Sequence, residues 1–227
     1  MKKAGKILCV ALLAAAVLIG AGVLAGRYFQ LGPWGYLKYE TFQLGEKIFA
    51  YSETEEVCYR GKKQIGGTLY LPEDGRQTRG IVILSHGLNG TARESRIYSE
   101  NLAKAGMAVY AFDFCGGSNE SRSSGDTRTM SVRTEIEDLN CVIEMVKGWN
   151  WVDSEKIVLM GESQGGLVSA LTAAGREDIE SLILLYPAFS LPDLMKNSFE
   201  ELTDVPENFT FMGMELGRAY CEDIWEL

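Results

Sequence analysis

The sequence of 227 residues predicts an α/β fold with a mostly parallel sheet, an antiparallel N-terminal hairpin and the start of a helical cap. Four short apolar runs alternate with three helix-like segments, which is the order of a parallel sheet with right-handed crossovers. Two strand-like runs come before them and acidic amphipathic segments come after them. No further strand is predicted beyond the fourth apolar run.

The first element is an uncharged apolar segment, residues 7–26, which follows Lys2, Lys3 and Lys6. Its 20 residues are enough to cross a hydrocarbon core of about 30 Å, which favours a signal anchor with the domain outside the cytoplasm. The alternative is a cleaved signal peptide and a secreted protein. The predicted domains are an anchor or signal peptide (1–27), a linker (28–52), an α/β core (53–189) and an incomplete helical cap (190–227).

Strands are predicted from the apolar pattern. Residues 55–59 and 65–71 form a hairpin in this prediction, because a short polar turn joins two strand-like runs. The four later runs are continuous rather than alternating, which is typical of strands buried on both faces. They lie at residues 81–84, 107–112, 157–160 and 182–185.

Helices are predicted between and after these buried strands. One segment places Val132, Ile136, Leu139, Ile143 and Val146 at helical spacing, so that they share one face. The predicted helices span residues 94–105, 132–146, 167–174, 191–202 and 213–227.

Net charge and cysteine content limit the kinds of partner, metal site and disulfide that the sequence predicts. The net charge of −9 repels phosphate backbones, so nucleic-acid binding is not expected. Five cysteines (Cys9, Cys58, Cys115, Cys141 and Cys221) show no C-x-x-C spacing, so neither a metal site nor another cofactor is predicted. Cys9 lies in the apolar segment. The other four are predicted to be free and buried, with one or two disulfides as the alternative in a domain outside the cytoplasm.

The hexapeptide Gly-Glu-Ser-Gln-Gly-Gly at residues 161–166 lies between a predicted strand and a predicted helix. This context is typical of a nucleophile elbow, with Ser163 as the nucleophile. Gly161 and Gly165 allow the strand and the helix to approach closely. The alternative is a glycine-rich turn whose serine caps the helix.

A second candidate loop, His86-Gly87-Leu88, directly follows the first buried strand. Acyl transfer needs two backbone N–H donors for the oxyanion, and the predicted donors are Leu88 and Gln164. His86 and Gly87 are predicted to order this loop. His86 is the only histidine of the sequence, and it is not predicted to be the catalytic base of Ser163.

Three motifs together resemble the α/β-hydrolase superfamily over about residues 55–227, nearest to the cinnamoyl/feruloyl-esterase-like and serine-aminopeptidase-like bacterial hydrolases. The motifs are His86-Gly87-x-x-Gly90, Phe112-Asp113-Phe114 with Gly116-Gly117-Ser118, and Gly161-x-Ser163-x-Gly165-Gly166.

This resemblance implies an α/β-hydrolase fold and a serine hydrolase that cleaves small carboxylic esters through an acyl-enzyme. In the family, the triad acid and histidine follow two further strands. Those last strands are missing from this sequence, so a C-terminally truncated enzyme is expected. The alternatives are a non-catalytic binding protein of the same fold and a peptidase of the same fold.

Four other acidic residues lie near the predicted site or at element boundaries. Asp113 and Asp153 are predicted to cap or form turns, and Glu162 to contact neighbouring structure. Asp193 has two interpretations, a charge in the first turn of a cap helix or a triad acid, and the first is favoured.

Overall fold

A computed structural model describes residues 48–227, of which Phe49–Leu227 form one compact unit. The predicted anchor at residues 7–26 lies outside the described residues, and so does most of the predicted linker. Among the described residues, no helix combines the length and apolar character that crossing a membrane requires. The first strand already begins at Tyr51, so the last two residues of the predicted linker belong to the sheet.

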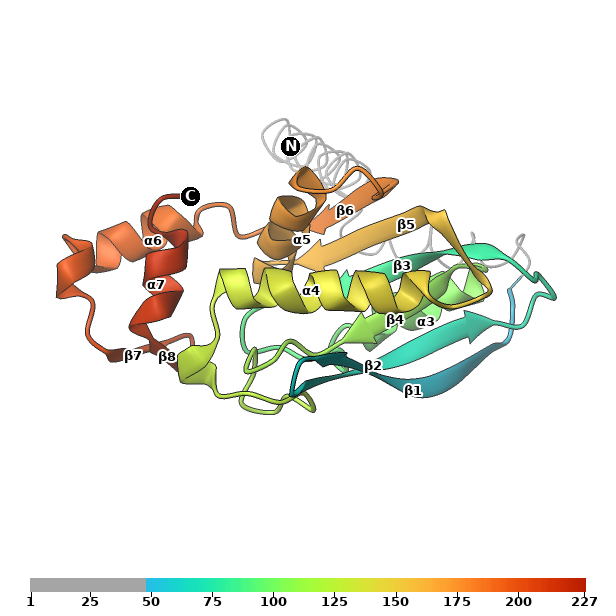
Figure 1. The fold of residues 1–227 in the computed structure, drawn as a ribbon, viewed down its shortest axis with the longest axis horizontal. Coiled ribbons are helices and arrows are strands. Elements are labelled where there is room, and N and C mark those ends of the chain that lie inside the picture. The colour runs from blue at the N-terminus through green and yellow to red at the C-terminus, as the bar shows by residue number, and fades with distance from the viewer. Residues whose placement is uncertain (1–47) are drawn as a thin grey trace, which may run out of the picture. The chain divides into compact units, whose positions relative to one another are not determined.

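Six strands form one mixed sheet in the order β1-β2-β4-β3-β5-β6 (Figure 1). The β1–β2 hairpin is antiparallel, and β2 also pairs with β4 antiparallel. The pairs β3–β4, β3–β5 and β5–β6 are all parallel. The strands are β1 (Tyr51–Arg60), β2 (Lys63–Pro72), β3 (Arg79–Ser85), β4 (Ala108–Phe112), β5 (Val152–Glu162) and β6 (Ser181–Leu185). The predicted parallel sheet with an antiparallel N-terminal hairpin is confirmed.

Helices pack against both faces of this sheet. Helices α4 (Val132–Lys147) and α5 (Gln164–Ala174) border the larger hydrophobic core, and α3 (Arg96–Lys104) borders a smaller one. The side chains of β3 alternate between the two cores: Ile81 and Ile83 enter the larger core, whereas Val82 and Leu84 enter the smaller one. This alternation is the reason that β3 is a continuous apolar run.

The structure differs from the prediction at strand β6. Residues 182–185 are expected to form a strand buried on both faces, but β6 is a partly exposed edge strand. Leu182 is 37% exposed and Ile183 is 38% exposed. In the described part of the chain, β6 pairs only with β5, so its other edge has no strand partner.

The structure also differs from the prediction in the C-terminal segment, residues 190–227. Two helices and no strand are expected there, but the segment contains a small antiparallel hairpin of β7 (Asn208–Phe211) and β8 (Met214–Gly217). Met212 and Gly213 both have positive φ angles, as a type I′ hairpin turn requires. The alternation of polar and aromatic residues in β7 is the sequence signal for this strand.

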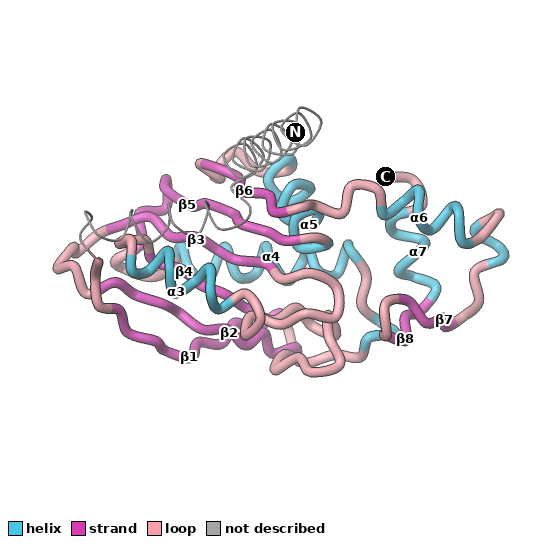
Figure 2. The backbone as a smooth tube through the Cα atoms, turned by 180° about the vertical axis from the view of Figure 1, so that it is seen from behind, coloured by secondary structure: helices cyan, strands magenta, loops and turns pink. Residues whose placement is uncertain are grey.

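The helices of the C-terminal segment are shorter than predicted. They are α6 (Leu191–Ser198) and α7 (Arg218–Ile224), with a short 3₁₀ turn at Leu202–Asp204. Figures 1 and 2 show the segment gathered at the end of the sheet toward which β5 points. It therefore lies at the carboxyl ends of the parallel strands, where α/β proteins place their binding sites.

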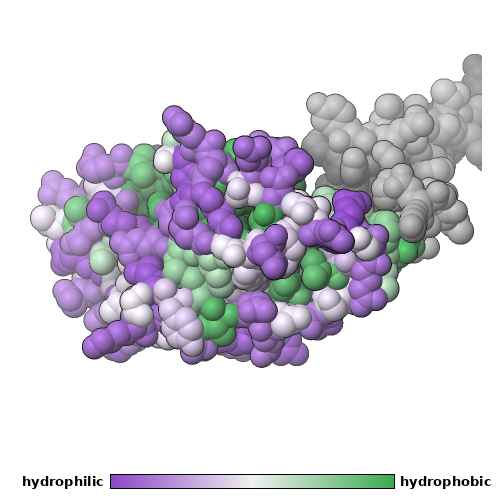
Figure 3. All heavy atoms as spheres, turned by 45° about the vertical axis from the view of Figure 1, so that its right-hand side comes forward, coloured by the Kyte–Doolittle hydropathy of each residue, from purple (hydrophilic) through white to green (hydrophobic). Residues whose placement is uncertain are grey.

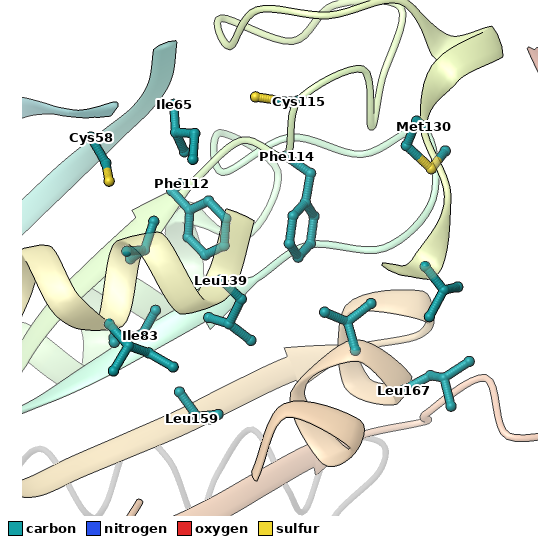
Figure 4. Close-up of a cluster of buried hydrophobic side chains, with 14 of the residues drawn as sticks. Cys58, Ile65, Ile83, Phe112, Phe114, Cys115, Met130, Leu139, Leu159 and Leu167 are labelled. Carbon is teal, nitrogen blue, oxygen red and sulfur yellow. The ribbon is translucent and has the colours of Figure 1, made fainter. Parts of the chain in front are cut away.

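The described surface seen in Figure 3 is mostly hydrophilic, with smaller hydrophobic patches between the charged and polar residues. Most apolar side chains are instead packed inside. Figure 4 shows part of the larger core, in which Phe112 lies beside α4 and packs against Phe114.

Candidate active site

Ser163 lies at a sharp turn between the last residue of β5 and the first residue of α5. Its φ of 51° and ψ of −120° cost a residue with a Cβ roughly 1–3 kcal/mol. The backbone holds this conformation, because the Ser163 N–H donates to the carbonyl of Leu185 and the Ser163 carbonyl accepts from Ala188. The Oγ makes no hydrogen bond with another described residue. The turn has the predicted elbow geometry, and the role of Ser163 as nucleophile stays a prediction.

The glycines around Ser163 are required by close packing. A Cβ at Gly161 would lie 2.3 Å from the carbonyl oxygen of Gly165, and a Cβ at Gly165 would lie 2.3 Å from that of His86. Real Cβ atoms do not approach backbone oxygens so closely. The two predicted supporting glycines therefore let β5, α5 and the loop after β3 meet at one point.

The loop after β3 lies directly against Ser163. A Cβ at Gly87 would lie 3.1 Å from the Ser163 Cβ and 3.6 Å from its Oγ. The backbone N–H groups of Leu88 and Gln164 donate no hydrogen bond to any of residues 48–227. The structure thus brings the two predicted oxyanion donors to the region of Ser163 with both N–H groups unused.

His86 is buried and both of its ring nitrogens are occupied. Its Nδ1 lies 2.7 Å from the carbonyl oxygen of Gly87, and its Nε2 accepts from the N–H of Phe114 at 3.0 Å. These partners fix the tautomer with the proton on Nδ1. Burial lowers the pKa of His86, so the ring is neutral. This arrangement leaves no nitrogen free to accept a proton from Ser163, and the role of His86 in ordering the loop stays a prediction.

The side chain of Gln164 takes part in a buried network that the sequence does not reveal. Its Nε2 donates to Glu135 of α4 at 2.8 Å, and its Oε1 accepts from the Tyr220 hydroxyl of α7 at 2.5 Å. Burial raises the pKa of Glu135 to about 8, which leaves its carboxyl protonated at neutral pH. One residue of the elbow is therefore tied both to the core and to the C-terminal segment.

The β7–β8 turn also contacts the loop after β3. Asn89 Nδ2 donates to the Met212 carbonyl at 3.4 Å, and Asn119 Nδ2 donates to the Gly213 carbonyl at 3.2 Å. Asn89 Oδ1 in turn accepts from the N–H of Asn119 at 3.2 Å. The C-terminal segment therefore contacts Asn89, the residue that follows Leu88, and through Tyr220 it contacts Gln164 itself.

The four acidic residues have structural partners or exposed positions. Asp113 is buried and accepts from the N–H groups of Ala92 and Arg122. Glu162 accepts from the hydroxyls of Ser95 and Tyr186, so it contacts neighbouring structure as predicted.

The other two acids lie at element ends. Asp153 accepts from the N–H of Glu155 and pairs with Lys156 at 2.8 Å. Asp193 is exposed in the first turn of α6, where its charge favours the helix.

A cavity of about 330 Å³ opens elsewhere, between the hairpin β1–β2 and α3, and Ser163 is not among its lining residues. Some of its charged side chains pair with one another: Arg96 with Glu53 at 2.7 Å, and Arg122 with Asp113 at 3.3 Å. A nucleophile with oxyanion donors is absent from its lining, so the elbow is the better candidate site. The described residues also contain no cluster of side chains suited to a metal ion.

Comparison with known proteins connects this geometry to a family. A family model described as serine aminopeptidase, S33, matches residues 76–214, a stretch that includes the loop after β3 and the elbow. Among curated proteins, cutinase est2 of Thermobifida alba is 27% identical over 126 residues, which is 54% of this chain and 39% of the relative. The chain therefore spans about two-fifths of the length of the curated relatives that it matches.

Solved structures share the fold. Est1E of Butyrivibrio proteoclasticus, solved with ferulic acid bound, has a TM-score of 0.67 at 24% identity, over 76% of this chain and 71% of that chain. DcsB, solved in complex with a substrate analogue, has a TM-score of 0.54 at 26% identity, over 60% of this chain and 45% of that chain.

Proposed function

Because this chain belongs to the serine aminopeptidase S33 family, which has the α/β-hydrolase fold, we propose that it is a serine hydrolase that cleaves carboxylic esters. The observation that carries the proposal is the meeting of Ser163, in its elbow conformation, with two unused backbone N–H groups. The names of the similar proteins, a cutinase and Est1E with ferulic acid bound, favour esters over other acyl substrates.

In the proposed reaction, the Ser163 Oγ attacks the ester carbonyl and forms an acyl-enzyme with loss of the alcohol. Water then releases the acid. The N–H groups of Leu88 and Gln164 hold the negative oxygen of each tetrahedral intermediate. Each such donor contributes on the order of 10²–10³ in turnover. Gly87 supports this geometry, because a Cβ at this position would crowd the Cβ of Ser163 at 3.1 Å.

We propose that the general base comes from outside the described residues. His86 has no free ring nitrogen, and a serine without its histidine loses on the order of 10⁶ in turnover. We propose that the triad histidine and acid belong to a further segment that pairs with the open edge of β6. Leu182 and Ile183 are partly exposed, which supports a further segment that packs over this edge of the sheet. A reading frame beyond the codon of Leu227 that encodes an aspartate and a Gly-His segment would support it.

Two alternatives follow from specific observations. The description of the family as serine aminopeptidases supports a peptidase of the same fold. The absence of a free histidine nitrogen supports a non-catalytic protein that binds a ligand beneath the C-terminal segment. Against the binding protein stands the strained conformation of Ser163, which binding alone does not require.

A fluorophosphonate probe tests the nucleophile. We expect the probe to label Ser163, slowly in this chain and faster when imidazole is added as an external base. Labelling should disappear in Ser163→Ala and persist in Ser198→Ala, since Ser198 is an exposed serine of α6. Absence of labelling both with and without imidazole would favour the binding protein.

Substrate preference separates esterase from peptidase. Imidazole alone cleaves p-nitrophenyl esters, so we expect the protein with imidazole to cleave p-nitrophenyl butyrate faster than imidazole without protein, and leucine p-nitroanilide to remain uncleaved under the same conditions. Cleavage of the anilide at a comparable rate would favour the peptidase. Equal ester cleavage by Ser163→Ala would remove Ser163 from the mechanism.

A further inference from the structure

Two cysteines that lie 83 residues apart in the sequence are in direct contact. Cys58 of β1 and Cys141 of α4 place their sulfur atoms 2.6 Å apart. Both thiols are free in the structure, and this contact is shorter than that between the sulfur atoms of Cys221 and Met195, which lie 3.6 Å apart. Figure 4 shows Cys58 beside Ile65, on the side of the sheet that α4 covers.

Neighbouring interactions hold the two cysteines in this position. Arg60, two residues after Cys58, pairs with Asp138 of α4 at 2.7 Å and with Glu137 at 2.6 Å. The Cys141 thiol also lies 3.4 Å from the carbonyl oxygen of Tyr59. Strand β1 and helix α4 are thus held together directly beside the sulfur contact, so bond formation requires little movement of the backbone.

We propose that Cys58 and Cys141 form a disulfide that links β1 to α4, with a small oxidised disulfide such as glutathione disulfide as the oxidant. The Cys141 thiolate attacks the oxidant, which releases one glutathione thiolate and leaves a mixed disulfide. The Cys58 thiolate then attacks the Cys141 sulfur and releases the second glutathione. Two electrons pass to the oxidant, and the two protein thiol protons end on the two reduced glutathione molecules.

The order of these steps follows from exposure. Cys141 is half-buried and reachable, whereas Cys58 is only 5% exposed. Burial also raises the pKa of the Cys58 thiol to about 12, so this thiol reacts poorly with a free oxidant. Contact with Cys141 makes the second step intramolecular, which compensates for the small thiolate fraction.

The other described cysteines have no sulfur of a second cysteine nearby. The Cys115 thiol lies 3.7 Å from the carbonyl oxygen of Gln64, and the Cys221 thiol lies 3.6 Å from the sulfur of Met195. Both are buried, and they serve as internal controls. The proposal agrees with the predicted position of the domain outside the cytoplasm, where disulfides persist.

Peptide mapping tests the link in the full chain. The protein is equilibrated with oxidised or reduced glutathione, its remaining thiols are alkylated under denaturing conditions, and it is digested with trypsin. Cleavage after Lys47, Arg60, Arg133 and Lys147 places Cys58 in peptide 48–60 and Cys141 in peptide 134–147. We expect these two peptides joined after oxidation, and separate and alkylated after reduction. The peptides of Cys115 and Cys221 should be alkylated in both samples.

Thermal unfolding gives a second readout. A disulfide that closes so long a loop is expected to raise the Tm by on the order of 5–10 °C, and a reductant should reverse the change. Cys141→Ala should abolish the shift while Cys115→Ala retains it, and Cys58→Ala serves as a second disabling variant. Fully alkylated Cys58 and Cys141 at the most oxidising ratio would overturn the proposal. So would an oxidation-dependent Tm shift of equal size in Cys141→Ala.

Discussion

The hydroxyl of Tyr220 in α7 donates a hydrogen bond of 2.5 Å to Oε1 of Gln164, the residue that follows the proposed nucleophile. The other end of the Gln164 side chain donates to Glu135 in α4. All three side chains are buried. The first turn of α5 is therefore held by hydrogen bonds from opposite directions, one from the core and one from the C-terminal segment.

Tyr220→Phe is expected to destabilise the protein by about 1–3 kcal/mol, because it leaves the buried Oε1 of Gln164 without a donor. For a chain of this size the Tm should fall by roughly 2–4 °C per kcal/mol. Tyr59→Phe is the control, since Tyr59 is largely exposed and its hydroxyl has no partner among the described residues. Equal Tm values for the two variants would contradict the importance of the bond.

Glu135 makes the stability of the folded state depend on pH. Burial raises its pKa from 4.5 to about 8 in the folded state, so the folded protein binds a proton that the unfolded chain has lost. The contribution of Glu135 to the free energy of unfolding should therefore be largest below pH 4.5, fall as the pH rises toward about 8, and change little above that pH. Full ionisation costs on the order of a few kcal/mol.

Glu135→Gln tests this dependence, because glutamine keeps an acceptor for Gln164 and cannot ionise. Urea unfolding at about pH 5 and about pH 8 should show that the stability of wild type relative to this variant declines at the higher pH. Glu120→Gln removes an exposed carboxyl and controls for the change in net charge. A constant difference between wild type and Glu135→Gln across this range would show that Glu135 is not protonated in the folded state.

Ser163→Gly is expected to be more stable than Ser163→Ala by about 1 kcal/mol. Alanine keeps the Cβ that disfavours a φ of 51°, whereas glycine adopts this conformation without strain. The larger conformational entropy of glycine in the unfolded chain offsets part of the gain. Thermal unfolding of the two variants measures the difference, and a less stable glycine variant would show that the elbow stores no strain.

Gly165→Ala is expected to cost about 3 kcal/mol or more, or to prevent folding, because the new Cβ would meet the backbone oxygens of His86 and Ser85 at 2.3 and 2.5 Å. Gly175→Ala at the other end of α5 is the matched control. Its Cβ would meet nothing closer than 3.7 Å, so its Tm should stay within a few degrees of wild type. The yield of soluble protein and the Tm of both variants measure the contrast.

Local patterns in the sequence predicted most of the sheet. The apolar runs at residues 81–84 and 157–160 lie inside β3 and β5, and the motifs around Gly90, Asp113 and Ser163 identified the family correctly. These features depend on short-range periodicity and on turn geometry, both of which a single sequence displays.

Features that depend on distant partners could not be predicted. Leu182 and Ile183 form an apolar run in either environment, so the run does not reveal whether anything covers β6. The contact between Cys58 and Cys141, and that between Gln164 and Tyr220, join residues far apart in the chain. No short sequence pattern around these residues indicates that the two members of each pair meet. The hairpin at residues 208–217 is a different case, since the alternation of Phe209 and Phe211 was present but is short.

The open edge of β6 has a consequence for the behaviour of the protein in solution. Residues 181–185 read Ser-Leu-Ile-Leu-Leu, with no charged side chain or proline to discourage pairing with a foreign strand. Two molecules with this edge uncovered can join their sheets side by side through backbone hydrogen bonds. Any form of the chain that leaves β6 bare should therefore self-associate as its concentration rises, and a single lysine in place of Ile183 should keep it monomeric.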